Sequence, residues 1–143
     1  MQAEAARRAG RDHRLRLLIG DVVGAATRWA NTAEILILST SGDRWTKRDW
    51  VEWASRDSGR EMGANAQAME DHARSIRLLT DDPIFLTPLA KAKEVIGDGA
   101  VFEGLHDAGP SSGESRSQAY ARLRAVRTLF SDLEQAAASA LSG

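Results

Sequence analysis

The sequence contains no cysteine, so disulfide bonds, thiolate metal sites and cysteine nucleophiles are all excluded. No apolar run approaches the roughly 18 residues that a membrane-spanning helix needs. No stretch alternates apolar and polar residues in the manner of a half-buried strand. The net charge of −1 lacks the basic excess of a general nucleic-acid-binding protein, which argues against nucleic acid as a partner.

The residues that are present fit one domain over residues 1–143. A chain of 143 residues buries about two thirds of its unfolded surface, which is enough for a single core. Arginine outnumbers lysine 16 to 3 and alanine is the commonest residue. We interpret this bias as the mark of a GC-rich, bacterial genome.

The last regular segment, residues 119–141, has an apolar residue at every third or fourth position. The steps alternate between four and three, which is typical of a helix packed nearly parallel to its neighbours. The seam consists of Ala119, Leu123, Val126, Phe130, Leu133, Ala137 and Ala140. Tyr120, Leu129 and Ala136 flank the seam and widen it, so we expect a bundle helix that closes an intramolecular core.

A second line of the same period predicts a helix from residue 12 to residue 39. It consists of Leu15, Leu18, Val22, Ala25, Trp29, Thr32 and Leu36. Ile19, Ala26 and Ile37 widen the line, as a helix in a bundle requires. Residues 1–11 are rich in alanine and arginine but have almost no apolar face, so we expect an exposed basic N-terminal extension.

The next segment has the signals of one long helix. Thr46 followed by Asp49 resembles a capping box, which marks a helix start. We expect one continuous helix from residue 46 to residue 80, because its length then matches the first helix. A kink near Gly59 is the alternative.

The third segment is less regular. Asp82 before Pro83 is a helix-start signal, and Thr87 before Pro88 repeats it, which predicts two short helical pieces. The sequence Gly-Asp-Gly at 97–99 interrupts the second piece. We therefore predict an all-α, four-helix, up-down-up-down bundle with an irregular, broken third helix.

Three of the four tryptophans, Trp45, Trp50 and Trp53, lie close together in the sequence. Trp50 and Trp53 are three residues apart, so both lean toward one groove near an end of the bundle. Such a cluster either closes the core as an aromatic plug or forms a partner-binding or oligomer surface, because tryptophan is enriched at interface hot spots.

The arginines concentrate near the two ends of the sequence. Residues 1–16 have a local charge of +3, from two acids and Arg7, Arg8, Arg11, Arg14 and Arg16. Residues Arg116, Arg122, Arg124 and Arg127 join them at one positive end if the first and last helices bring them together. This patch is either balanced by nearby acids or attracted to an anionic membrane surface, with nucleic acid as the third alternative.

Few residues suggest catalysis. Glu103 and His106 form one Glu-x-x-His pair, whereas a ferritin-like di-metal centre takes two such pairs and two further glutamates. His13 and His72 are most simply surface residues. The chain has no Gly-x-Ser-x-Gly nucleophile elbow and no phosphate-binding loop. We therefore expect no cofactor and a protein that is not an enzyme, with a ferritin-like metal enzyme as the alternative.

The first residues, MQAEAARRAGRDHRLRLLIGDVVGAATRWANTAEI, resemble a pattern in uncharacterised actinobacterial single-span membrane proteins. In that family an N-terminal transmembrane helix runs on into an Ala/Arg-rich helix and a cytoplasmic helical bundle. The sequence printed here has no such membrane helix. The resemblance implies a cytoplasmic bundle of unknown activity, associated with a membrane.

These observations favour a non-enzymatic interaction or oligomerisation module. Its expected partners are another protein, a second copy of the chain, or a membrane surface contacted through the N-terminal arginines. The alternatives are the ferritin-like metal enzyme with Glu103 and His106 and a nucleic-acid-associated regulator that uses the terminal arginines.

Overall fold

The computed structural model describes residues 2–39, 47–97, 100–102 and 112–141, and all of its regular structure is helical. The elements are α1 (Gln2–Ser39), α2 (Lys47–Ala54), α3 (Asp57–Leu79), α4 (Pro83–Gly97), the 3-10 turn η1 (Ala100–Phe102) and α5 (Ser112–Ala140). No strand occurs in these ranges, so the prediction of an all-α fold is confirmed.

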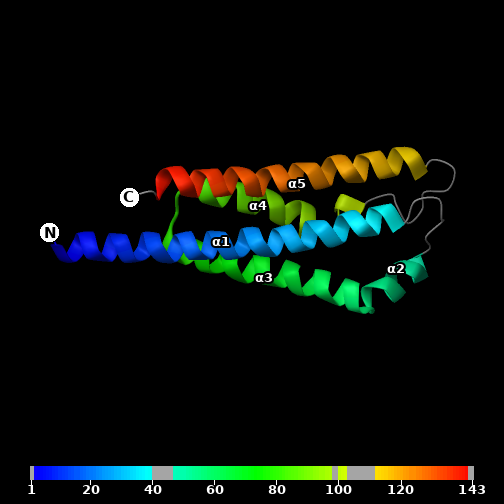
Figure 1. Ribbon diagram of the computed structural model, residues 1–143, viewed down its shortest axis with the longest axis horizontal. Coiled ribbons are helices and arrows are strands. Elements are labelled where there is room, and N and C mark those ends of the chain that lie inside the picture. Colours follow the sequence, from blue (N-terminus) through cyan, green and yellow to red (C-terminus); the bar gives the residue numbers. More distant parts are fainter. Residues whose placement is uncertain (1, 40–46, 98–99, 103–111, 142–143) are drawn as a thin grey trace.

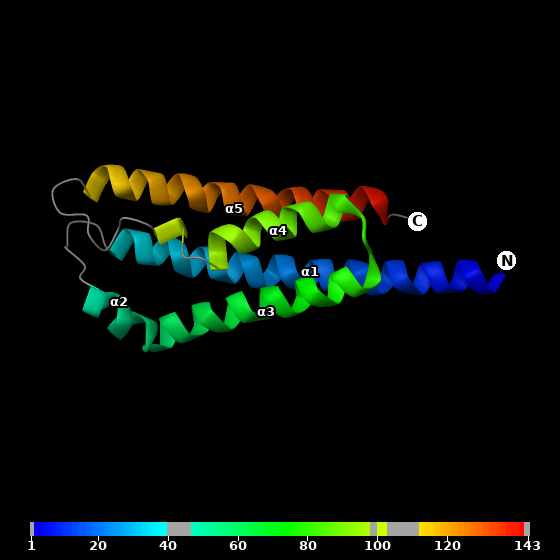
Figure 2. The ribbon, with the colours of Figure 1, turned by 180° about the vertical axis from the view of Figure 1, so that it is seen from behind.

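The long helices lie side by side along the molecule (Figures 1 and 2). α1 packs against both α3 and α5, and α4 packs along α5. α3 and α4 are in looser contact with each other than either is with its other neighbour. The short helix α2 contacts α3, and η1 contacts both α4 and α5.

The core follows the two apolar lines of α1 and α5. On α5 the predicted seam is buried from Ala119 to Ala137, but Ala140 is exposed and Leu141 is buried in its place. On α1 the line is buried at Leu15, Val22, Ala25, Trp29 and Leu36. Each large apolar side chain removed from water contributes about 1.5–3 kcal/mol, so these two lines supply much of the stability.

The expected continuous helix over 46–80 is two helices. α2 ends at Ala54, and α3 begins at Asp57 after Arg56, which has extended backbone angles and makes no capping side-chain hydrogen bond. Gly59 explains the tight corner: a Cβ there would lie 2.6 Å from Ala54 Cα and would also collide with the Trp53 carbonyl oxygen. The break therefore lies one turn before the kink considered at Gly59. The predicted cap residue Thr46 lies outside the described residues.

The expected break before Pro88 is absent, because α4 is one helix from Pro83 to Gly97. Asp82 does begin it as predicted: its Oδ1 accepts a hydrogen bond from Ile84 N–H at 3.0 Å. Pro88 removes one helical hydrogen bond, but Phe85, Leu89 and Ala92 are buried at helical spacing on both sides of it. That burial outweighs the lost bond. The helix ends at Gly97, where the Gly-Asp-Gly sequence predicted an interruption.

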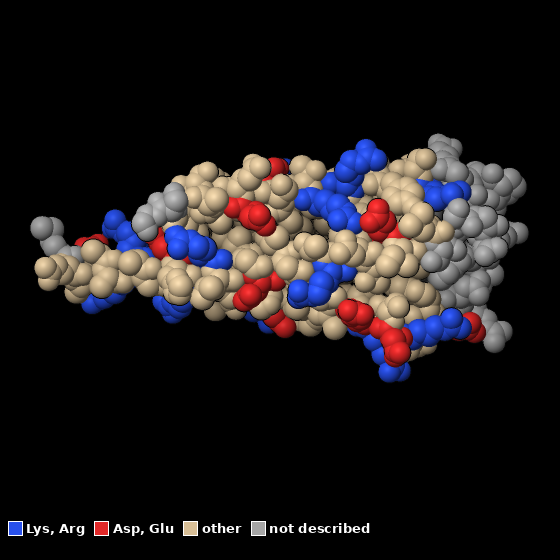
Figure 3. All heavy atoms as spheres, in the orientation of Figure 1, with Lys and Arg blue, Asp and Glu red and all other residues tan. Residues whose placement is uncertain are grey.

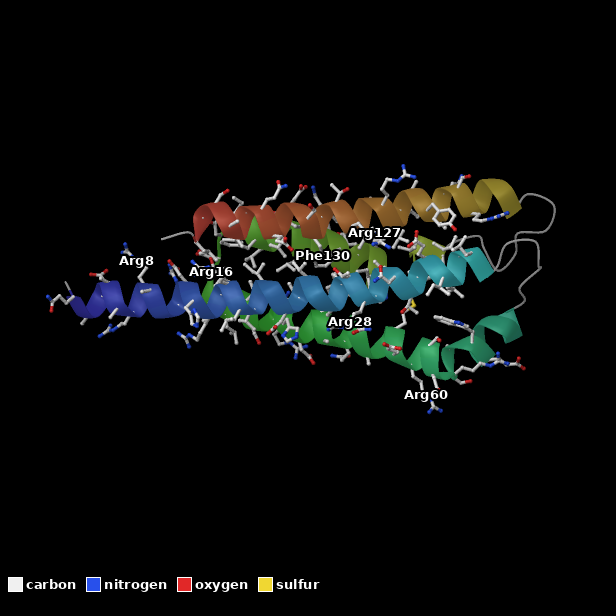
Figure 4. The ribbon with its side chains drawn as sticks, in the orientation of Figure 1. Arg8, Arg16, Arg28, Arg60, Arg127 and Phe130 are labelled. Atoms are coloured by element: carbon white, nitrogen blue, oxygen red, sulfur yellow. The ribbon has the colours of Figure 1, made fainter. Side chains whose placement is uncertain are left out.

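Polar side chains link the helices at a few points. Arg28 on α1 donates through Nε to Asn65 Oδ1 on α3 at 3.2 Å, and Asn65 is the one buried polar residue in the described part of the chain. Arg127 on α5 bonds to Glu34 Oε2 on α1 at 3.1 Å. Figure 4 shows Arg28 and Arg127 between the helices that they join.

Candidate functional site

The first thirteen residues of α1 extend beyond the rest of the molecule. We call residues 2–14 the N-terminal projection. Leu15 is the first buried residue of α1, and residues 2–11 are all exposed. A helix rises about 1.5 Å per residue, so these thirteen residues span about 20 Å. Figures 1 and 2 show this part of α1 extending past the ends of α3 and α5.

The sequence explains why the projection is helical without a packing partner. Alanine and arginine are among the strongest helix formers, and the segment contains both in abundance. The N-terminal extension expected from the sequence is therefore exposed, and it is a continuation of α1 rather than a separate segment. A regular helix fixes the relative directions of its arginines, which a frayed chain would not do.

Three of the five predicted arginines line up on the projection. Arg7, Arg11 and Arg14 follow at i, i+4 and i+7, which places them on one helix face. We call these three residues the basic stripe. Arg11 makes one weak contact with its neighbour Asp12, at 3.4 Å. Arg8 and Arg16 point in other directions, and Figure 4 shows Arg8 extending away from the helix into solvent.

The basic stripe leads into a shallow apolar hollow between α1 and α3. We call it the leucine hollow; it is lined by Arg14, Leu17, Leu18, Ser75, Leu78 and Leu79. Leu17 is 56% exposed and Leu78 is 84% exposed. Two leucines left in water beside a row of arginines give this end of the molecule an apolar face and a charged face next to each other.

Basic residues outnumber acids near this surface, because Arg8 and Arg16 add two positive charges to those of the basic stripe. Glu4 and Asp12 lie on the projection itself, and Asp81 and Asp82 lie in the connection after α3. Arg74, one turn before Leu78 on α3, adds a further positive charge on the exposed side. On the face seen in Figure 3 the charges of both signs are mixed over the body of the molecule, and basic side chains lie along both edges of the projecting part with acidic ones among them.

The arginines at the start of α5 do not join this surface. α5 begins at the end of the molecule opposite the projection (Figure 1). The expectation of one positive end formed by both groups is wrong, because a helix that returns along α1 brings its last residues, not its first, beside the start of α1. Arg127 pairs with Glu34 instead.

Of the three clustered tryptophans, only Trp53 has a described side chain. Trp53 is half-buried and packs against the core, as the aromatic-plug alternative expects of it. Trp45 and the side chain of Trp50 lie outside the described residues, so a tryptophan partner surface stays a prediction. Trp29 is buried on α1 and contacts Phe102 of η1, with ring centroids 6.1 Å apart.

The two residues proposed as metal ligands in the ferritin-like alternative also lie outside the described residues. Glu103 and His106 both fall in the range 103–111, which the structure does not describe. Among the described residues, no three histidine or acidic side chains come together as metal ligands. His72 is half-buried on α3 and His13 is exposed on the projection.

Sequence reasoning found the arginines but missed the leucines. Leu17 and Leu78 lie outside the apolar lines predicted from the sequence. That position was the only sequence feature that could have indicated their exposure.

Comparisons with protein families, with curated proteins and with solved structures find no match for this chain. Within the described residues, no helix has the length and apolar character to cross a membrane.

Proposed function

We propose that this chain is a non-enzymatic helical interaction module that docks on an anionic membrane surface through the end carrying the N-terminal projection. Its scaffold is an up-down-up-down arrangement of α1, α3, α4 and α5. Two observations support that arrangement: the long helices lie side by side, and successive ones begin at opposite ends of the molecule (Figure 1). The scaffold holds the projection at one end, where it is free to meet a flat surface.

The observation that carries the proposal is the juxtaposition of the basic stripe with the leucine hollow. Arginines alone would suit any polyanion, including a nucleic acid. Exposed leucines add a face that gains free energy only when it leaves water. Arginines are attracted to an anionic leaflet, and exposed leucines next to them gain free energy when they enter the headgroup region, so the two features together favour a membrane surface.

The expected energies are sufficient for reversible binding. Each arginine near an anionic leaflet contributes about 1 kcal/mol, so the three residues of the basic stripe contribute about 3 kcal/mol. Burying the exposed parts of Leu17 and Leu78 adds about 1–2 kcal/mol for each side chain. Loss of translational freedom offsets part of this sum, which leaves a weak attachment that depends on salt.

The test is sedimentation of the protein with lipid vesicles. We expect binding to vesicles of phosphatidylcholine with phosphatidylserine, little binding to phosphatidylcholine alone, and release at high salt. The variant Arg7→Gln/Arg11→Gln/Arg14→Gln should weaken binding roughly 100-fold, because about 3 kcal/mol is lost. A matched variant, Arg56→Gln/Arg60→Gln/Arg124→Gln, removes the same charge far from the projection and should bind nearly as the unaltered protein does.

Two results would contradict the proposal. Equal loss of binding in both triple variants would mean that net charge, and not the basic stripe, controls attachment. Binding to a short DNA duplex that is as tight as vesicle binding, and is lost in the first triple variant, would favour the nucleic-acid alternative. Association with another protein or a second copy through the tryptophans stays a separate prediction.

A further inference from the structure

A groove runs between α3 and α4 on a different side of α3 from the leucine hollow. Its floor contains Met69 and Ala73 of α3 and Leu89 and Ala92 of α4, all of them buried. At the bottom it reaches Phe130 of α5, which points into the interior of the molecule (Figure 4). The groove is therefore open at the surface and apolar down to the central core.

Small residues on the facing sides of the two helices create the groove. Gly63, Ala66 and Ala73 line it on α3, and Ala92 and Gly97 line it on α4. Side chains this short do not fill the space between two helices, and α3 and α4 are in loose contact with each other. The small residues of α3 and α4 are therefore the cause of the groove.

The shape of the groove limits what it can hold. On α3 it extends from Gly63 to Arg77, which at about 1.5 Å per residue is a length of about 21 Å. Its volume is only about 170 Å³, below the roughly 300–1,000 Å³ of pockets for drug-sized molecules. So long, narrow and open a space favours a single unbranched chain, extended along the groove with one side exposed to solvent, over a fused ring system.

The rim of the groove has one unbalanced positive charge. Lys93 Nζ on α4 lies 3.1 Å from Glu70 Oε1 on α3, so this ion pair spans the mouth near the middle and neutralises itself. Arg77 lines one end of the groove and makes no ion pair or side-chain hydrogen bond with the described residues. An anionic group at that end would meet the only rim cation without a carboxylate partner.

We propose that the α3–α4 groove binds an unbranched fatty-acid carboxylate, with the carboxylate on Arg77 and the alkyl chain extended toward Gly63. The Glu70–Lys93 pair crosses over the chain and holds it against the floor. This site is distinct from the membrane-docking surface, and it stands or falls independently of it.

Chain length provides the test. Calorimetric titration with octanoate and tetradecanoate should show tighter binding of the longer chain, because more of the groove is filled. Gly63→Leu should narrow the far end, because Gly63 lines the groove and a Cβ added there meets nothing within 4 Å. We expect this variant to lose the advantage of tetradecanoate and to bind octanoate as before. Gly20→Leu is the matched control, because Gly20 is equally open and lies outside the groove.

The head group provides the second test. Arg77→Gln should weaken the binding of both acids about tenfold, the usual effect of losing a charge-assisted hydrogen bond. Arg74→Gln removes the same charge from the same helix outside the groove and should have little effect. Decanol, which lacks the carboxylate, should bind more weakly than decanoate to the unaltered protein and equally weakly to Arg77→Gln.

Three results would overturn the inference. The first is tetradecanoate binding that Gly63→Leu leaves unchanged. The second is acid binding that Arg77→Gln and Arg74→Gln weaken equally. The third is NMR perturbation of Leu17 and Leu78 methyl groups in place of those of Met69 and Leu89, which would assign the acids to the leucine hollow. None of these results would bear on vesicle binding through the basic stripe.

Discussion

The corner between α2 and α3 should make Gly59 the least replaceable described glycine, and Gly59→Ala tests this. An added Cβ would approach Ala54 Cα to 2.6 Å and would collide with the Trp53 carbonyl oxygen. Both obstacles are backbone atoms, so rotation of a side chain cannot relieve the clash. α2 must move away from the first turn of α3, and Trp53 must then leave its half-buried position against the core.

The magnitude is a balance of two effects. Alanine gains up to about 1 kcal/mol over glycine within a helix. Steric overpacking costs about 1–3 kcal/mol, so we expect a net loss of about 1–2 kcal/mol in the free energy of unfolding. At a chain length of 143 residues this corresponds to a fall in Tm of about 3–8 °C.

The assay is urea denaturation followed by circular dichroism, with tryptophan fluorescence of the native state as a second signal. Gly63→Ala is the matched control on the same helix, since its Cβ meets nothing within 4 Å. It should raise the free energy of unfolding by about 0.5–1 kcal/mol. The reasoning is refuted if Gly59→Ala is as stable as Gly63→Ala and its fluorescence spectrum is unchanged.

Two further predictions concern the cap of α4 and the exposed leucines. Asp82→Ala should lower the free energy of unfolding by about 1 kcal/mol because Ile84 N–H loses its acceptor, whereas Asp81→Ala, which removes no capping bond, should change it by less than about 0.5 kcal/mol. Equal values in urea denaturation would show that the cap contributes nothing. Leu133→Ala removes a fully buried side chain and should cost about 2–5 kcal/mol, while Leu78→Ala, at a residue 84% exposed, should cost almost nothing. A large loss of stability in Leu78→Ala would mean that Leu78 packs in the core and is not a docking residue.

The long helices could be predicted from the sequence because their apolar spacing is sustained. In α1 and α5 the three-four period continues over many turns, so a single misplaced residue does not hide it. The ends of these helices were predicted less well: α1 begins at Gln2 and not at residue 12, α5 begins at Ser112 and not at residue 119, and near the end of α5 Leu141 is buried and Ala140 is not. Regular packing of one helix against two neighbours produces this repeated pattern.

The breaks could not be predicted, because they depend on tertiary contacts. Neither Ser55 nor Arg56, which separate α2 from α3, is a proline or glycine that would mark a helix end. Only the folded structure shows that position 59 has no room for a Cβ beside the backbone of Ala54. Pro88 is a strong helix-breaking signal, yet the burial of Phe85 and Leu89 around it keeps α4 whole.

Only the arginines of the candidate site could be predicted from the sequence. Local charge identified the five N-terminal arginines, but the alignment of Arg7, Arg11 and Arg14 on one face followed only from the continuation of α1 to Gln2. The leucine hollow required the structure, since exposure of Leu17 and Leu78 depends on where α3 ends relative to α1. The α3–α4 groove likewise depends on which faces of the two helices meet, and apolar periodicity does not determine that.

The absence of native cysteine permits the most direct test of membrane docking. A single introduced cysteine, Leu78→Cys, takes an environment-sensitive fluorophore at one defined position, and Arg60→Cys places the same fluorophore far from the projection (Figure 4). Addition of vesicles containing phosphatidylserine should shift the emission of the probe at residue 78 to the blue and leave the probe at residue 60 unchanged. An unchanged spectrum at residue 78, or an equal shift at both positions, would contradict docking through the leucine hollow.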